Sequence, residues 1–169
     1  MPGKHRRYFL KDKESRELLE RASQRFKVGL KQVFGEKAGI EVVETEFGEV
    51  CLINGKPVLV VTKAAVYPTL VSKELFGMLP RIVVDMGAVP FVCKGANIMA
   101  PGIRRFEGSF AKGDVVFVVD ERHGKPLALG EATYNVEEAR SVKQGMVIKN
   151  IHYVGDSVWK VIKDLAIIR

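Results

Sequence analysis

The spacing of hydrophobic residues gives the chain a helical start, followed by a run of strands. From Ser15, apolar residues recur at helical spacing as far as Val33, which predicts an amphipathic helix capped by Ser15 and stopped near Gly35. Its lysines and arginines fall on the polar side. Solvation is the ordinary role of such a face, and RNA contact is the less favoured alternative.

Three segments rich in valine and isoleucine follow this helix. They predict strands over residues 39–45, 49–54 and 57–62. The last two are joined by Asn54-Gly55, the pair that favours a two-residue type I′ hairpin turn.

A break in the pattern predicts a domain boundary near the middle of the chain. Tyr67-Pro68-Thr69 predicts the start of a short helix that reaches Phe76, with Pro68 in its first turn. Gly77-Met-Leu-Pro80 ends that pattern. We therefore expect an N-terminal mixed α/β domain over residues 1–79 and a second domain over residues 80–169.

The second half of the chain is predicted to be mainly β. A helix is expected over residues 85–94, with Asp85 as its cap, Pro90 near its first turn and Gly95 as its stop. Asn135 is expected to cap a brief helix, and residues 157–168 suggest another. Strands are expected over residues 81–84, 97–100, 114–120, 127–134 and 146–154. Short strands with glycines at their ends favour a small barrel, so the predicted fold class is α+β, with a small β pseudo-barrel after the first domain.

The charge of the chain points to an anionic partner. The 169 residues hold 27 Lys and Arg against 20 Asp and Glu, a formal net charge of +7, which suggests nucleic acid first and an acidic membrane second. A basic protein without such a partner is the alternative. The sequence has no apolar run that could span a bilayer and no signal-peptide pattern, so we expect a cytoplasmic protein with no membrane partner.

Catalytic motifs are absent from the sequence. There is no P-loop, no dinucleotide fingerprint and no zinc-protease motif, and the histidines lie in no recognisable nucleophile arrangement. Cys51 and Cys93 lie in apolar surroundings, which predicts buried thiols instead of a disulfide or a metal site. We therefore expect a protein that is not an enzyme and has no cofactor and no metal.

The most informative stretch is Lys94-Gly-Ala-Asn-Ile-Met-Ala-Pro-Gly-Ile103. Gly95 allows a turn with positive φ, and Gly102 has no Cβ to block a ligand. Arg104 and Arg105 follow at once and are suited to neutralise phosphates. A helix stop followed by a Pro-Gly turn explains the same residues without any ligand.

Several motifs together resemble a known family. Val84-Asp-Met-Gly-Ala88 and the 94–103 stretch resemble the core of PUA domains, the RNA-binding modules of pseudouridine synthases and archaeosine transglycosylases. Gly145-Met-Val-Ile-Lys-Asn-Ile-His-Tyr-Val-Gly-Asp156 looks like the strand that closes their barrel. With Tyr67-Pro-Thr-Leu70, these motifs make the chain similar to the malignant T-cell amplified sequence family. Its archaeal relatives share the layout of an N-terminal α/β domain followed by a PUA domain.

This resemblance implies a non-catalytic RNA-binding protein that works in translation. Its expected partners are tRNA or rRNA, the small ribosomal subunit and a protein like density-regulated protein, in initiation, re-initiation or recycling. One alternative is a stand-alone PUA accessory protein for an RNA-modification enzyme. Because bacterial glutamate kinases also carry PUA domains, a protein-interaction or small-ligand domain without an RNA role is a third.

The resemblance places the RNA surface along the 85–94 helix, the glycine loop (residues 95–102) and the last strand (residues 145–153). The residues expected to form it are Lys94, Gly95, Ala96, Asn97, Gly102, Arg104, Arg105, Lys149, His152 and Tyr153. The four cations would contact phosphates, and the small residues would allow close approach of the backbone. Asn97 would bind a base or close the turn. His152 and Tyr153 alternate across a strand, so only one of them faces outward, where it would stack on a base. Packing in the core is the alternative for Tyr153. The methionines at 86, 99 and 146 are expected to pack.

Overall fold

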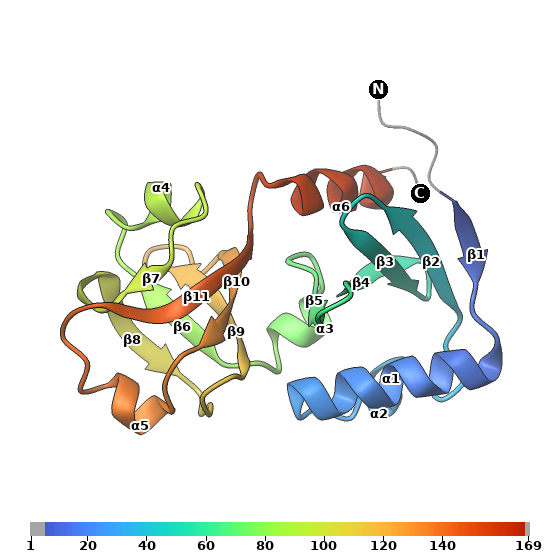
Figure 1. Ribbon diagram of the computed structural model, residues 1–169, viewed down its shortest axis with the longest axis horizontal. Coiled ribbons are helices and arrows are strands. Elements are labelled where there is room, and N and C mark those ends of the chain that lie inside the picture. The colour runs from blue at the N-terminus through green and yellow to red at the C-terminus, as the bar shows by residue number, and fades with distance from the viewer. Residues whose placement is uncertain (1–5, 168–169) are drawn as a thin grey trace. The chain divides into compact units, whose positions relative to one another are not determined.

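A computed structural model describes residues 6–167, and the side chains of residues 6–165. The chain forms two compact units, which Figure 1 shows as ribbons. The first contains the residues up to Glu74 and those from Ile162 on, and the second contains Leu75–Val161. The division lies a few residues before the boundary that the sequence suggested after residue 79.

The first unit is built on an antiparallel sheet of five strands in the order β1-β2-β3-β4-β5. These strands are β1 (Arg7–Phe9), β2 (Ile40–Thr45), β3 (Gly48–Ile53), β4 (Lys56–Val61) and β5 (Val66–Pro68). The three predicted strands are confirmed as β2, β3 and β4. Asn54 and Gly55 connect β3 to β4 with φ values of 53° and 84°, as a type I′ turn requires.

The single long helix predicted for this unit is wrong, because the chain forms two helices there. α1 (Asp12–Phe26) ends at Lys27, whose φ of 60° is left-handed, and α2 (Leu30–Phe34) follows. The start was also misplaced. Lys11 is the N-cap, its backbone N–H donates to the Glu14 carboxylate at 3.0 Å, and Ser15 is buried inside the first turn.

The predicted helix start at Pro68 is wrong as well. Pro68 lies in β5, an edge strand, where a residue without an N–H costs no ladder hydrogen bond. The helix α3 (Lys73–Phe76) begins five residues further along the chain.

The second unit contains a curled six-stranded sheet in the order β7-β11-β10-β9-β6-β8. Its strands are β6 (Arg81–Val84), β7 (Ile98–Met99), β8 (Ile103–Glu107), β9 (Val115–Asp120), β10 (Pro126–Ala132) and β11 (Met146–Tyr153). Only β6 and β9 pair in parallel; the other neighbours are antiparallel. The helical segments are α4 (Val89–Val92), the 3₁₀ turn η1 (Ala100–Gly102), α5 (Val136–Ala139) and the start of α6 (Ser157–Ile167), whose residues from Ile162 on belong to the first unit.

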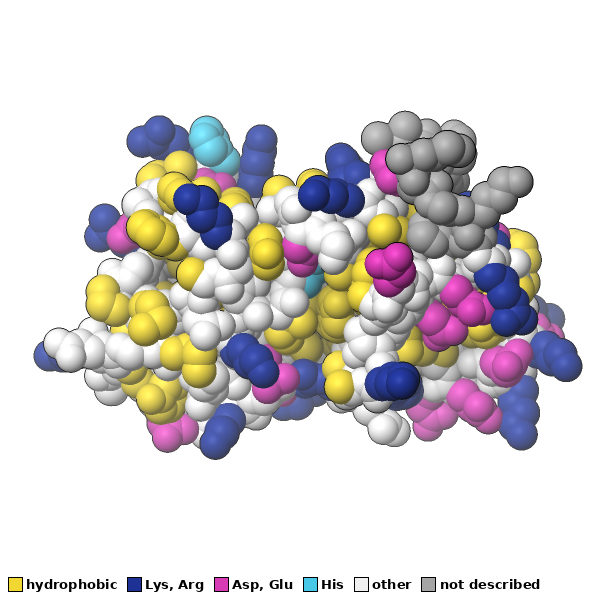
Figure 2. Space-filling view, turned by 45° about the horizontal axis from the view of Figure 1, so that its top comes forward, with side chains coloured by type: hydrophobic (Ala, Val, Ile, Leu, Met, Phe, Trp, Pro, Cys, Tyr) yellow, Lys and Arg dark blue, Asp and Glu magenta, His cyan; other side chains and the backbone are white. Residues whose placement is uncertain are grey.

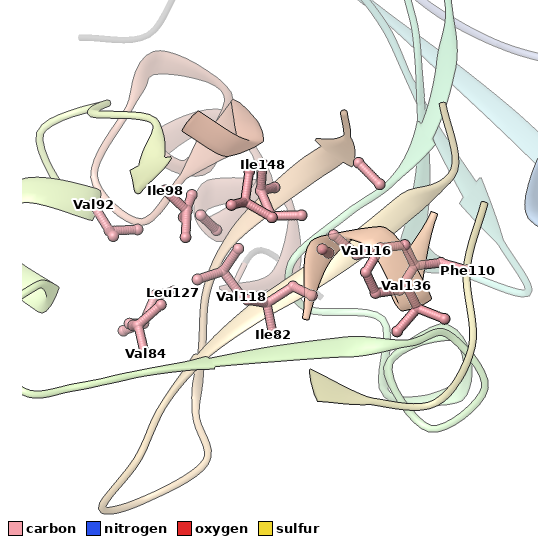
Figure 3. Close-up of a cluster of buried hydrophobic side chains, with 14 residues drawn as sticks. Ile82, Val84, Val92, Ile98, Phe110, Val116, Val118, Leu127, Val136 and Ile148 are labelled. Atoms are coloured by element: carbon pink, nitrogen blue, oxygen red, sulfur yellow. The ribbon is translucent and has the colours of Figure 1, made fainter. Parts of the chain in front are cut away.

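The buried core of the second unit takes residues from every strand except β8, whose Ile103 and Phe106 pack against it but are only partly buried. Ile82 and Val84 of β6 meet Val116 and Val118 of β9 and Ile148 of β11, and all five are almost completely buried (Figure 3). Valine and isoleucine suit a pleated surface that is covered on its inner face. This packing confirms the predicted small barrel, which the curled sheet forms only in part.

Most strands of the second half are confirmed, but β8 was missed. Its sequence, Ile-Arg-Arg-Phe-Glu, sets two arginines side by side and so breaks the alternation that marks a strand. Asn135 is the N-cap residue of α5 but makes no side-chain cap; its Oδ1 instead accepts the backbone N–H of Lys112 at 2.8 Å.

Asp120 fixes the turn between β9 and β10. Its buried carboxylate accepts the backbone N–H groups of Arg122, His123 and Lys125. Burial raises the pKa of Asp120, but these hydrogen bonds outweigh it and hold the pKa below its ordinary value. The carboxylate form of Asp120 therefore stabilises the fold at pH values above the pKa that this residue has in the unfolded chain.

We expect acid to remove this stabilisation. The free energy of unfolding should be steady above about pH 4 and fall as the pH drops through the lowered pKa of Asp120. Urea titrations at several pH values measure it. Asp120→Asn does not titrate, so its free energy of unfolding should fall less over the same range. An equal fall in both proteins would contradict this role.

Among the described residues, no helix combines the length and hydrophobicity needed to cross a membrane.

Candidate nucleic-acid interface

A single helical turn carries the start of the glycine loop. The predicted helix over residues 85–94 is shorter than expected, because α4 covers only Val89–Val92 with Pro90 in its first turn. The residues before it form a turn, in which Asp85 Oδ1 accepts the backbone N–H of Ala88 at 2.9 Å. Gly95 follows with a φ of +96°, so the chain reverses there at little cost.

Asn150 fastens the loop after α4 to the last strand. Its side-chain amide donates to the carbonyl of Val92 at 3.1 Å and to that of Ala96 at 2.9 Å. Its backbone N–H donates to Oδ1 of Asn97 at 3.0 Å. Asn150 pairs with Gly130 of β10, next to a register shift in the pairing of β10 with β11. Oδ1 of Asn97 thus holds the loop to β11, and binding of a base by this residue stays a prediction.

Gly95 of the same loop also packs against the ring of Tyr153 on β11. A Cβ built on Gly95 would lie 3.0 Å from Cε1 of the Tyr153 ring, so only glycine lets the backbone approach the ring this closely. His152 is completely buried, and its Nδ1 lies 2.8 Å from Oδ2 of Asp156. The hypothesis that His152 contacts RNA is therefore wrong. Tyr153 is only partly buried.

Two exposed lysines and three exposed apolar side chains lie on or beside the elements that this loop joins. Lys94 follows α4, and Lys149 precedes Asn150 on β11. Phe91 is 66% exposed, Met99 47% and Met146 38%, and Met99 pairs with Met146 across β7 and β11. We call this the α4–β11 surface; its residues are Phe91, Lys94, Ala96, Met99, Met146 and Lys149. Figure 2 shows exposed hydrophobic side chains with lysines and arginines among them.

The exposure of two methionines corrects a prediction. Met99 and Met146 were expected to pack in the core, but they lie on the open side of paired strands. Flexible, polarisable methionine side chains suit a surface that receives a flat ligand.

The remaining predicted residues, Gly102, Arg104 and Arg105, lie on η1 and β8, and their contact with RNA stays a prediction. Gly102 has no positive φ; its absent Cβ would lie 3.3 Å from that of Ala88, and its carbonyl accepts the Asp85 N–H at 2.9 Å. Its role is therefore close packing of η1 on the turn before α4. Arg104 and Arg105 lie on β8, at the other end of the strand order. They pair with Glu121 at 3.5 Å and Glu107 at 3.0 Å.

The α4–β11 surface has the chemistry of a single-strand nucleic-acid site. An exposed aromatic ring offers a face on which an unpaired base can stack, and ammonium groups beside it attract phosphates. Sequence reasoning missed Phe91 and Asn150. In a helix of one turn no periodicity shows which side chain faces solvent, and the contacts of Asn150 span 53 to 58 residues of sequence.

In the part of the chain that the structure describes, no three His, Cys, Asp or Glu side chains gather in a way that could hold a metal ion. Both cysteines are free, and burial raises the pKa of the Cys51 thiol to about 12.

We expect Gly95→Ala to lower the free energy of unfolding by more than the strain of a positive φ alone would explain. The variant adds both a strained positive φ and a Cβ against Tyr153, so its free energy of unfolding should fall by about 2 kcal/mol. Gly113→Ala is the matched control, since Gly113 has a φ of +92° and no atom within 4 Å of a Cβ. Thermal melts of both variants compare them. Equal losses would show that the contact with Tyr153 does not matter.

Comparisons with known proteins agree with this architecture. Residues 80–154 match the family described as PUA domain, and residues 6–72 match a domain of unknown function (DUF1947). The chain is 37% identical to an uncharacterized protein of Methanocaldococcus jannaschii over 91% of this chain and 95% of the other. It is 32% identical to malignant T-cell-amplified sequence 1-B of Xenopus laevis, over 77% and 75%.

A yeast relative and two solved structures extend the comparison. Translation machinery-associated protein 20 of Saccharomyces cerevisiae is 38% identical over 47% of this chain and 48% of its own length. A PUA-domain structure from Aeropyrum pernix, a tartrate complex, has a TM-score of 0.81 and 28% identity over 95% and 94% of the two chains. A hypothetical protein of Pyrococcus horikoshii has a TM-score of 0.78 and 31% identity over 92% and 99%.

Proposed function

Since this chain belongs to the malignant T-cell-amplified sequence family of PUA-domain proteins, we propose that it binds single-stranded RNA and works with the translation machinery. The α4–β11 surface is the RNA site in this proposal. The motifs of this chain resemble PUA domains, which are the RNA-binding modules of pseudouridine synthases and archaeosine transglycosylases. A relative in yeast is named as associated with the translation machinery.

The observation that carries the proposal is the fastening of the glycine loop by Asn150. Three hydrogen bonds of 2.9–3.1 Å tie residues 92–97 to β11. They hold Lys94 and Lys149, which come from distant parts of the sequence, on elements that are fixed to each other. A site fixed before binding loses less conformational entropy when the ligand arrives.

Single strands fit this surface better than duplexes. Phe91 offers its ring only to a base whose face is free, and bases in a duplex are already stacked on both faces. The ligand that we propose is therefore an unpaired end or loop of a tRNA or rRNA. By analogy with the family, the small ribosomal subunit and a protein like density-regulated protein are the proposed partners.

RNA binding is tested by the fluorescence anisotropy of a labelled 12-nucleotide single-stranded RNA with the full chain. If Lys94 and Lys149 each neutralise one phosphate, a plot of log K against log salt should have a slope of about −1.4. A hairpin RNA without unpaired ends is the control and should bind more weakly. Equal binding of the hairpin, or a slope near zero, would contradict the proposal. Sedimentation with ribosomal subunits tests the link to translation separately.

A further inference from the structure

β8 is an open edge of the six-stranded sheet. In the described chain it pairs with β6 and with no other strand. One side of its backbone is therefore free to accept a further strand. Exposed edges of this kind are ready templates for pairing with another polypeptide.

A hollow of about 400 Å³ lies along this edge. Its lining includes four consecutive residues of β8, from Ile103 to Phe106, and residues 139, 140 and 142 in and after α5. Successive side chains of a strand point to opposite faces of the sheet. Four consecutive residues can line one hollow only if the hollow runs along the edge of the strand, so we call it the β8–α5 groove.

The lining of the β8–α5 groove is both apolar and cationic. Ile103, Phe106 and Val142 are partly buried against the core of the unit, and they offer apolar contacts to alternate side chains of an extended ligand. Arg104, Arg105 and Arg140 are the only charged residues of the lining. An acidic ligand therefore meets three positive charges and no negative one in the groove.

These arginines are available to a ligand. Arg104 and Arg105 have side chains 60% and 57% exposed, and each is paired with one glutamate that is itself partly exposed. Ion pairs at such positions contribute little and exchange readily. Within the described residues, Arg140 has no ion pair or side-chain hydrogen bond, and it is exposed.

We propose that the β8–α5 groove binds an acidic segment of a partner protein, which adds to the sheet as an extended strand beside β8. The open edge favours a polypeptide over RNA, because a nucleic acid has no alternating N–H and C=O groups with which to continue a β-ladder. Strand addition supplies affinity through the main chain, and the arginines select acidic side chains.

The test uses the full chain and a fluorescein-labelled decapeptide of alternating glutamate and valine. Binding is measured by anisotropy, beside the single-stranded RNA described above. Two control peptides are matched to it: one alternates lysine and valine, and one carries an N-methyl group on every residue, which removes the N–H donors along both edges. The unaltered chain should bind the acidic peptide and neither control.

Two variants separate this groove from the RNA surface. Arg140→Glu should weaken peptide binding at least about fivefold and leave RNA binding within about twofold. Lys149→Glu should do the reverse. Thermal melts check that both variants are folded.

Three results would overturn the proposal. Failure of the unaltered chain to bind the acidic peptide would mean that the arginines only protect the edge from unwanted pairing. Binding of the N-methylated peptide as tightly as the unmodified one would exclude strand addition. Loss of RNA binding in Arg140→Glu with peptide binding unchanged would assign the groove to RNA.

Discussion

Reversing the charge of Lys94 and Lys149 together is expected to weaken RNA binding by about 30-fold. Each substitution to glutamate removes one phosphate contact and places a carboxylate beside the RNA backbone. The salt dependence should almost disappear as well, because the slope reports the number of neutralised phosphates. Anisotropy with the 12-nucleotide RNA measures both quantities.

A charge-matched variant distinguishes this local effect from a general loss of positive charge. Lys112→Glu with Lys125→Glu changes the net charge by the same amount, at exposed positions in the turns before and after β9. It should retain most of the affinity. If the two double variants lose affinity equally, RNA is held by the overall field of the protein and not by the α4–β11 surface.

Replacing Asp156 by alanine should cause the largest fall in the free energy of unfolding among the substitutions proposed for this protein. Its carboxylate lies 2.8 Å from Nδ1 of the buried His152 and accepts the backbone N–H groups of Tyr153 at 3.0 Å and Trp159 at 2.7 Å. Asp156→Ala leaves these groups without their acceptor, so the free energy of unfolding should fall by about 3 kcal/mol. Trp159, the single tryptophan of the chain, reports the transition by its fluorescence in urea.

Asp156→Asn separates charge from hydrogen bonding at this position. Burial raises the pKa of Asp156, but the hydrogen bond and charge of His152 and the two backbone N–H groups outweigh it and lower the pKa. The carboxylate therefore stabilises the fold above the unfolded pKa, and this contribution is lost as the pH falls through the lowered pKa. At pH 7, the free energy of unfolding of Asp156→Asn should fall by about half as much as that of Asp156→Ala. An alanine variant as stable as the unaltered chain would contradict this account.

Local patterns in the sequence were sufficient for the central strands of both units. The runs of valine and isoleucine in β2, β3, β4 and β9 mark these strands by composition alone, and the Asn54-Gly55 turn is set by two residues. The helix start at Lys11 was not predictable from the preference of serine for N-caps. The helix begins there because the carboxylate of Glu14 accepts a hydrogen bond from the backbone N–H of Lys11.

The candidate site was predictable only in outline. The glycine loop and the last strand were identified from residues 94–103 and 145–156, and the structure joins them. The connection itself depends on hydrogen bonds of Asn150 to residues more than 50 positions earlier in the chain, which no local pattern reveals. Arg104 and Arg105 were assigned to the same surface because they follow the loop in sequence, but β8 carries them to another edge of the sheet.

Photo-crosslinking of the full chain to a single-stranded RNA containing 4-thiouridine tests the central claim most directly. After digestion, mass spectrometry identifies the peptides that carry nucleotide. If RNA lies on the α4–β11 surface, the crosslinks will fall within residues 86–99 and 146–153, and Lys94→Glu with Lys149→Glu will remove them. Crosslinks confined to the first unit or to β8, and unchanged by these substitutions, would contradict the account.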